Sequence, residues 1–307
     1  MSSQPDLSVN VAGALRLANP VIAASGTWGY GDEYGDIVDV QKLGAIICKG
    51  TTLTPREGNP QPRIVEVTGG VLNSVGLQNI GVEALITEKA PLWAAWKVPV
   101  LVNIAGNTLE EYAQVAAKLE GVAGVSGIEV NISCPNVSKG GMHFGTDPSA
   151  ASEVTAAVKG ATSLPVIVKL SPNVTDIVAI AEAVEKAGAD AVSLINTVSG
   201  MAIDVKRCKP VLGNISGGLS GPAIKPIALL MVYRVAGCVK IPVIGCGGIM
   251  HAVDALEFIM AGATAVQVGT ASLTDPRATL AVIDGLAEYL ATRGIRSIGE
   301  LRGVARQ

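Results

Sequence analysis

Eight short apolar runs recur along the 307-residue chain, and polar stretches long enough to form helices separate them. Each run is rich in Val, Ile and Ala, and nearly every one ends in a polar or ionisable residue or in Gly. Near-continuous apolar runs are typical of strands that are buried on both faces of a parallel sheet. The runs lie at residues 20–25, 45–49, 98–103, 127–133, 165–169, 191–196, 242–247 and 265–269.

Eight such strands that alternate with helices predict an α/β fold, a single closed (β/α)8 TIM barrel that forms one domain over residues 1–307. Residues 7–17 alternate apolar and polar side chains, which predicts an N-terminal β-hairpin that caps the bottom of the barrel. Two connections, 51–74 and 198–220, are longer than a barrel needs, and we expect these inserted loops on the catalytic face. Helical periodicity is found over 108–120, 147–161, 175–187, 221–238, 251–260 and 275–292.

Composition excludes several classes of function. The net charge of −3, without a basic stripe or a nucleic-acid-binding motif, predicts no nucleic-acid partner. The most apolar region, 227–250, is interrupted by Arg234 and Lys240, so no run of roughly 20 apolar residues is available to span a membrane. The N-terminus carries Asp6 and resembles no secretory signal, and we therefore expect a cytoplasmic protein with no membrane contact.

Metal and triad chemistry lack the residues that they need. The five cysteines form no C-x-x-C pair, which argues against a zinc or iron–sulfur site in this chain. His143 and His251 are the only histidines, so we expect no metal site and no Ser-His-Asp triad. Cys48 and Cys246 lie within strand runs and are interpreted as small buried core residues.

Glycines mark the ends of the last two strands. Gly247-Gly248 and Gly269-Thr270 follow runs seven and eight, where barrels of this kind often bind a phosphate through backbone N–H groups. Gly221, which opens the preceding helix, adds a third loop. Because glycine has no Cβ to block phosphate oxygens, three such loops at adjacent strand ends predict a phosphorylated ligand.

Two lysines lie late in apolar strands, at Lys49 and Lys169. A buried ammonium group is costly unless it meets an anion, a hydrogen-bonding ligand or a covalent role. The sequence leaves open a Schiff-base nucleophile, a structural ion pair and a partner for electron-rich ligand atoms.

Four asparagines occupy comparable places, and each amide offers one acceptor and two donors. Such amides can pair with the alternating N–H and C=O edge of an amide, an imide or a pyrimidine. Their repetition at four positions predicts an amide-like ligand. They are Asn73, Asn103, Asn131 and Asn196.

Cys134 lies just past the fourth strand, in the stretch Asn131-Ile132-Ser133-Cys134-Pro135-Asn136, and a Gly-rich segment follows it. A thiol with a pKa near 8.5 can act as a general base when a neighbouring carbonyl makes a C–H bond acidic. We therefore interpret Cys134 as a candidate base at the catalytic face.

Longer motifs are spread over nearly the whole chain. Together with the glycine loops, they resemble the dihydroorotate dehydrogenase family, and specifically its class 1 flavoprotein form. The motifs are Ala24-Ser25-Gly26, Lys49-Gly50, Pro55-Arg56-Glu57-Gly58-Asn59-Pro60, Asn73-Ser74-Val75-Gly76-Leu77-Gln78-Asn79, residues 131–136, Val168-Lys169-Leu170-Ser171-Pro172 and Ile195-Asn196-Thr197.

The resemblance implies oxidation of dihydroorotate to orotate in pyrimidine synthesis, with non-covalent FMN at the barrel mouth. It implies that Cys134 removes the proton from C5 while hydride leaves C6 for the flavin. The residues implied to bind FMN are Ser25, Lys49, Gly50, Asn103, Asn131, Lys169, Ile195, Gly221, Gly247, Gly248, Gly269 and Thr270. Those implied to bind substrate are Lys49, Asn73, Ser74, Val75, Gly76, Leu77, Asn131, Asn196 and Thr197.

The subclass determines the expected partners. A cysteine at position 134 resembles class 1, because the membrane-associated class carries serine there. Residues 136–141 and Leu77-Gln78-Asn79 are more similar to class 1B than to the fumarate-reducing class 1A. Class 1B implies a homodimer within a heterotetramer, in which an electron-transfer subunit carries FAD and a [2Fe-2S] cluster and passes electrons to NAD+. This chain lacks a G-x-G-x-x-G fingerprint and cluster-type cysteines, which fits class 1A equally well.

Three alternatives remain from the sequence. A dihydropyrimidine dehydrogenase-like flavoenzyme has a similar barrel and also uses a cysteine, but its usual iron–sulfur extension is missing here. A lyase or isomerase could use Lys49 or Lys169 as a Schiff-base nucleophile on a phosphate-binding barrel. A non-catalytic ligand-binding barrel would hold a phosphate compound without turnover.

Overall fold

The computed structural model describes residues 5–13, 15–133 and 144–306. Eight parallel strands close into one barrel, in which the first strand pairs with both the last and the second. Each strand lies within its predicted run or extends one residue beyond it, so the predicted (β/α)8 barrel is confirmed. The strands are β3 (Val21–Ala23), β4 (Ala45–Ile47), β7 (Val100–Ile104), β8 (Gly127–Asn131), β9 (Val166–Leu170), β10 (Ala191–Leu194), β15 (Val243–Cys246) and β16 (Ala265–Val268).

The amino end of the barrel is closed by an apolar plug. The hairpin of β1 (Val9–Ala12) and β2 (Leu15–Leu17) contributes Val11 and Leu17 to a buried cluster that also contains Ile22, Ile47 and Leu101 of the barrel strands. Alternate residues of a strand point to opposite faces, so these positions fill the barrel while their neighbours pack against the surrounding helices. The predicted N-terminal hairpin is therefore confirmed.

Helices surround the strands, and several begin at the caps that their sequences offer. The side chains of Thr108, Asp147 and Asp176 accept backbone N–H groups at the start of three helices, α3 (Leu109–Leu119), α4 (Pro148–Ala161) and α5 (Ile177–Lys186). Each of the six predicted helical segments contains a helix. The six helices are α3, α4, α5, α6 (Lys225–Val235), α7 (Ala252–Met260) and α9 (Ala278–Arg293).

One helical region was missed by the sequence analysis. It consists of α1 (Gly81–Ala84), the π-helical turn η2 (Leu85–Lys89) and α2 (Ala90–Ala94). The change from α to π and back interrupts the 3.6-residue period from which a helix is predicted. A further short helix, α8 (Ala271–Thr274), follows β16.

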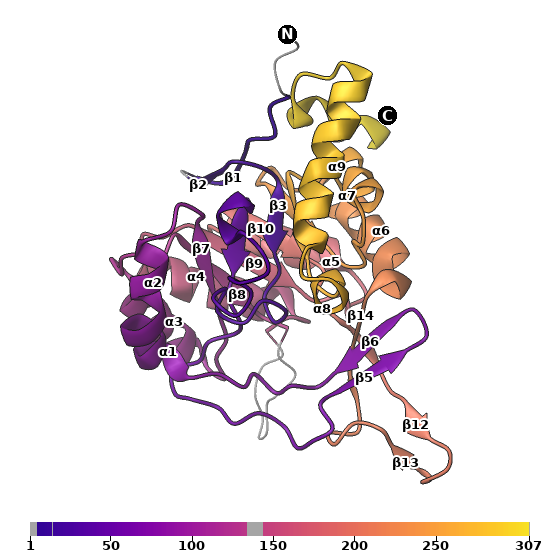
Figure 1. Cartoon of the computed structure of the whole chain (residues 1–307). Coiled ribbons are helices and arrows are strands. Elements are labelled where there is room, and N and C mark those ends of the chain that lie inside the picture. Colours follow the sequence, from indigo (N-terminus) through magenta and orange to yellow (C-terminus); the bar gives the residue numbers. More distant parts are fainter. Residues whose placement is uncertain (1–4, 14, 134–143, 307) are drawn as a thin grey trace.

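The two long insertions join into one structure. Strands β5 (Ile64–Val67) and β6 (Gly70–Asn73) of the first insertion pair with β14 (Gly217–Ser220) and β11 (Val198–Gly200) of the second, in the order β11-β14-β6-β5. This antiparallel sheet lies beside the barrel end opposite the β1–β2 hairpin, and the β12 (Ile203–Asp204)–β13 (Lys209–Pro210) hairpin projects beyond it (Figure 1).

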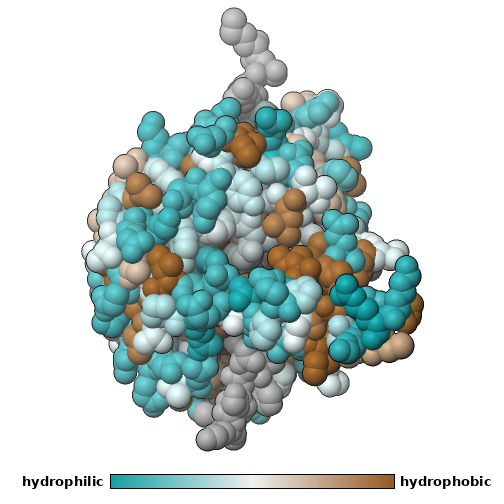
Figure 2. All heavy atoms as spheres, turned by 60° about the horizontal axis from the view of Figure 1, so that its bottom comes forward, coloured by the Kyte–Doolittle hydropathy of each residue, from teal (hydrophilic) through white to brown (hydrophobic). Residues whose placement is uncertain are grey.

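The surface at this end is mixed in character. Figure 2 shows mainly hydrophilic side chains, with apolar ones gathered toward one side of the view. Several large apolar side chains of the two insertions are exposed, namely Ile64, Met201, Ile203, Val205 and Ile215. No helix in the described part of the chain is long and apolar enough to cross a membrane.

Candidate active site

A cavity of about 560 Å³ opens at the carboxyl ends of the barrel strands. All eight strands contribute to its wall through residues at or close to their carboxyl ends, and both insertions add side chains. Every described residue that the sequence analysis assigned to a cofactor or a substrate lines this cavity. The structure thus brings these residues together, and their individual roles toward a ligand stay predictions.

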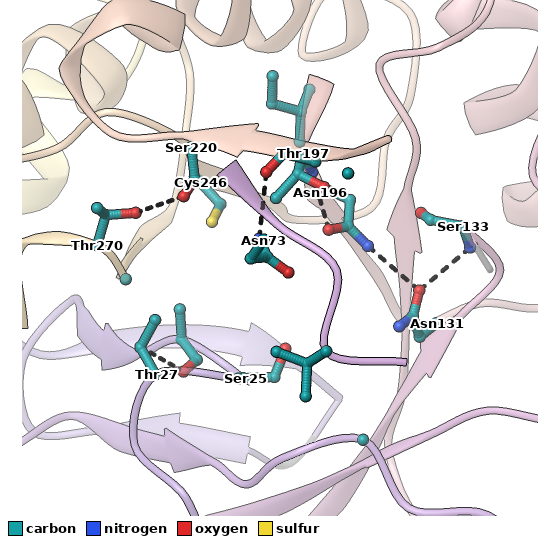
Figure 3. A pocket seen from close by; sticks show the side chains of 18 of the residues that line it. Ser25, Thr27, Asn73, Asn131, Ser133, Asn196, Thr197, Ser220, Cys246 and Thr270 are labelled. Atoms are coloured by element: carbon teal, nitrogen blue, oxygen red, sulfur yellow. Dashed lines mark hydrogen bonds between the residues drawn. The ribbon is translucent and has the colours of Figure 1, made fainter. Parts of the chain in front are cut away.

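Glycine loops form one side of the cavity. At Gly248, with φ +73°, an added Cβ would lie 2.6 Å from Lys225 Cβ, and at Gly221, with φ +103°, it would lie 2.8 Å from Gly70 Cα. Both positions therefore require glycine, because the chain must approach its neighbour closely with positive φ. Thr270 Oγ1 donates to Ser220 Oγ at 2.9 Å, which joins two of the loops (Figure 3).

Asparagine side chains form another part of the wall. Asn131, the last residue of β8, accepts from Asn196 Nδ2 at 3.3 Å and from the backbone N–H of Ser133 at 3.1 Å. Asn73, the last residue of β6, donates to the carbonyl oxygen of Gly218 at 3.3 Å. Figure 3 shows Asn73 between the Asn131–Asn196 pair and the hydroxyl groups of Ser220 and Thr270. Amides and hydroxyls thus face the cavity from different strands.

The loop after β6 is fixed tightly against its surroundings. Leu77 has φ +55°, and an added Cβ at Gly50 would lie 2.9 Å from Leu77 Cδ2. The Asn59 amide donates to the hydroxyl and carbonyl oxygens of Ser74 at 3.0 Å and 3.1 Å. An added Cβ at Gly76 would lie 2.6 Å from the Asn59 nitrogen. Residues 73–77 therefore have little freedom to move away from the cavity.

The two strand-end lysines differ. Lys169 is 4% exposed, and its ammonium group donates to Gln267 Oε1 at 2.9 Å and to Ser25 Oγ at 3.4 Å. The carboxylate of Glu129 lies 3.7 Å away. Burial is the largest single effect and lowers the pKa of Lys169, but the attraction and hydrogen bonding of Glu129, together with the attraction of Cys246, leave that pKa raised above its ordinary value. Lys169 is therefore charged at neutral pH.

Lys49 is half-buried, and its ammonium group lies 5.9 Å from the centroid of the Tyr30 ring. Among the residues that the structure describes, no carboxylate forms an ion pair with Lys49. Of the two strand-end lysines, Lys49 is therefore the one whose charge is available to an anionic ligand.

Sequence reasoning missed three polar residues beneath this cavity. Glu129, Ser193 and Gln267 are fully or almost fully buried in the middle of β8, β10 and β16, and they bond to one another. A carboxylate inside an otherwise apolar strand was the signal that could have drawn attention to them, because a buried charge requires partners.

The cysteines give a mixed result. Cys48 is fully buried, and burial raises the pKa of its thiol to about 12, which agrees with its interpretation as a core residue. Cys246 is only partly buried and lines the cavity, so its interpretation as a core residue is wrong, because the strand ends at the cavity wall. Cys134 lies outside the described residues. In the described ranges, no group of His, Cys, Asp and Glu is arranged to hold a metal ion.

Comparison with known proteins decides the family. A model of the family described as dihydroorotate dehydrogenase matches residues 6–290. The chain belongs to the dihydroorotate dehydrogenase family. Its similar relatives include a protein of Geobacter sp. (strain M21), 59% identical over 300 residues, and one of Geotalea daltonii, 58% identical over 301 residues, each alignment covering 98% of both chains.

A third dihydroorotate dehydrogenase relative, from Desulforamulus reducens, is 59% identical over 300 residues and again covers 98% of both chains. All three relatives carry the name dihydroorotate dehydrogenase B (NAD(+)), catalytic subunit. The family resemblance drawn from the sequence motifs is thereby confirmed, and the similarity is to class B proteins.

Proposed function

We propose that this chain oxidises dihydroorotate to orotate as a single FMN-binding barrel domain. The observation that carries the proposal is one cavity that combines three glycine loops, a buried charged lysine and amide groups at its wall. The names of the relatives and the family support the same reaction.

The residues present fit FMN. The loops at Gly221, Gly247–Gly248 and Gly269–Thr270 all line the cavity. At Gly221 and Gly248 the backbone packs too closely on its neighbours for a Cβ, so these positions offer backbone N–H groups to a phosphate. Charged Lys169 supplies a donor to electron-rich ring atoms. When bound, FMN accepts the hydride that leaves C6 of the substrate. The remaining FMN-binding residues in this proposal are Ser25, Lys49, Gly50, Asn103, Asn131 and Ile195.

The substrate is proposed to lie against the amide side of the cavity. Asn73, Asn131 and Asn196 can donate to and accept from the ring amides of dihydroorotate. Lys49 and the backbone of residues 74–77 meet its carboxylate, and Thr197 adds a hydroxyl group. Because these groups come from separate, tightly packed loops, they orient the ring and exclude water from it.

Cys134 is proposed as the general base. The chain lines the cavity on both sides of residues 134–143, through Ser133 before them and Gly145 after them. The Ser133 N–H group also donates to Asn131, one of the proposed substrate ligands. The Cys134 thiolate then removes the proton from C5, so one proton and one hydride leave the substrate and orotate forms.

Anaerobic flavin reduction tests this assignment. Purified protein is expected to be yellow, and dihydroorotate should bleach it whereas dihydrouracil should not. Cys134→Ala should slow the bleaching by about 10²-fold or more while FMN stays bound, because a general base typically contributes 10²–10⁴-fold. Cys238→Ala, at an exposed cysteine, is the matched control and should behave as wild type.

The pH profile gives a second readout of the same assignment. Wild-type bleaching should accelerate as pH rises toward the thiol pKa, since only the thiolate accepts the proton. A rate that does not change with pH, or loss of FMN from Cys134→Ala without a slower reaction, would contradict the role given to Cys134.

For the electron acceptor, we propose NAD+, reached through a second subunit that carries FAD and a [2Fe-2S] cluster. The relatives are named as catalytic subunits and as NAD(+) proteins, which supports this assembly. Exposed apolar side chains on the insertions, such as Ile203 and Val205, support a protein contact there. We propose a homodimer within a heterotetramer, located in the cytoplasm. Copurification of a cluster-bearing chain and turnover with NAD+ are expected, and turnover of the isolated chain with fumarate would favour class 1A.

A further inference from the structure

Glu129 is a fully buried carboxylate in the middle of strand β8, and the substrate and cofactor roles proposed above leave it unassigned. It does not line the cavity, so it cannot contact a ligand there directly. A buried carboxylate destabilises a protein unless it is paired and hydrogen-bonded. Its contacts therefore decide what it can do.

Four strands supply partners to this carboxylate. Ser193 Oγ and Gln267 Nε2 donate to Oε1 at 2.8 Å and 2.6 Å, and Asn103 Nδ2 donates to Oε2 at 2.7 Å. The Lys169 ammonium group lies 3.7 Å from Oε2. These partners come from β10, β16, β7 and β9, so Glu129 bonds across the interior of the barrel.

Two of these partners, Asn103 and Lys169, line the cavity and are among the proposed FMN ligands. Glu129 thus lies behind the cavity wall and contacts two of the polar groups that line it. Both groups also donate to Ser25 Oγ, each at 3.4 Å, and such long, weak hydrogen bonds can be replaced by stronger ones to a ligand.

We propose that Glu129 is a positioning residue, which holds Asn103 and the charged ammonium group of Lys169 in place for FMN. The proposal rests on the FMN-binding function given above. It means that the contribution of Lys169 to FMN binding depends on a carboxylate that does not touch the cofactor.

The charge of Lys169 provides a readout that simple structural support would not affect. Among the described residues, the titratable groups that act on this ammonium group are Glu129 on β8 and Cys246 at the end of β15, whereas its neighbours Gln267 on β16 and Ser25 after β3 are neutral. Without the carboxylate, burial of the ammonium group is opposed by the weaker attraction of Cys246 and favours the neutral form of Lys169. Lys169 would then lose its proton at a lower pH.

The experiment is titration of apoprotein with FMN between pH 5.5 and pH 9.5, by flavin fluorescence, in wild type and in Glu129→Gln. We expect the ratio of the variant Kd to the wild-type Kd to grow with pH by about 10-fold or more, the size of a lost charged hydrogen bond. Repeating both titrations with Cys246→Ser removes the other titratable group and should leave the trend unchanged.

A second experiment uses Lys169→Met as the background for Glu129→Gln. It keeps the proposal testable if Glu129→Gln alone folds poorly. The double variant Glu129→Gln/Lys169→Met has no buried charge left without a partner. In the Lys169→Met background, the effect of Glu129→Gln on the FMN Kd should no longer grow with pH, because the part that acts through Lys169 is absent and only the pH-independent contact with Asn103 remains.

The outcomes separate this inference from the function on which it rests. Wild-type apoprotein that takes up no FMN would overturn the proposed function. Wild type that binds FMN, together with a Kd ratio that is constant with pH, or one that grows equally with pH in the Lys169→Met background, would overturn the role of Glu129 alone.

Discussion

Gly248 allows a quantitative test of the glycine loops at the cavity. In Gly248→Ala, the new Cβ would lie 2.6 Å from Lys225 Cβ and 2.8 Å from Lys225 Cα and N, and these distances must increase beyond 3.0 Å. Lys225 cannot easily move away, because its ammonium group forms ion pairs with Asp254 at 2.7 Å and with Glu257 at 2.9 Å. The substitution should therefore displace the loop rather than the helix.

The free energy of unfolding should fall through two separate effects. Positive φ costs an alanine about 1–2 kcal/mol, and overpacking against fixed atoms costs about 1–3 kcal/mol. Gly121 is a matched control, since it has φ +70°, an exposed position outside the cavity and no atom within 4 Å of an added Cβ. Gly121→Ala should show only the cost of positive φ. In thermal unfolding, Gly248→Ala should therefore have a lower Tm than Gly121→Ala.

FMN affinity gives the functional half of the test. A displaced loop loses a backbone donor to the phosphate, and a hydrogen bond to a charged group corresponds to a loss on the order of 10- to 100-fold in Kd. Fluorescence titration of apoprotein should show this loss in Gly248→Ala, whereas Gly121→Ala should bind FMN as wild type does. Equal Tm values for the two variants, or an unchanged FMN Kd in Gly248→Ala, would refute the reasoning.

Two further predictions concern ionisable groups outside the proposed ligand set. Hydrogen bonds from Ser163 and Thr162 lower the pKa of the Glu120 carboxyl to about 2, so the stability it adds is present above about pH 4.5 and lost as pH falls toward 2. Acid unfolding should therefore show Glu120→Gln less stable than wild type near neutral pH, with the difference shrinking below pH 4.5; a difference that grew in acid would contradict the assigned bonds. Alkylation at pH 8, followed by mass spectrometry, should label exposed Cys208 well before Cys48, whose pKa of about 12 leaves almost no thiolate, and equal labelling rates would show that Cys48 is accessible.

The barrel could be predicted because its signal is local. Strands buried on both faces appear as short apolar runs, and the eight runs each contain one barrel strand. The sheet made by β5, β6, β11 and β14 could not be predicted in this way, because its two halves lie more than 120 residues apart and its strands are half-exposed. Pairing between distant insertions depends on the closed barrel, which brings their ends together.

The sequence predicted the polar residues at the strand ends, which line the cavity, but not the buried polar residues behind them. Parallel strands end at one edge, so polar residues at strand ends, such as Asn131 and Lys169, were expected to meet, and they do. The layer beneath follows from the two-residue period of a strand, since Glu129 lies two positions before Asn131 and Gln267 two before Gly269. Reading only the strand ends left this layer out. A polar residue two positions before a cavity-lining residue at a strand end therefore indicates a buried group that positions the residues of the site.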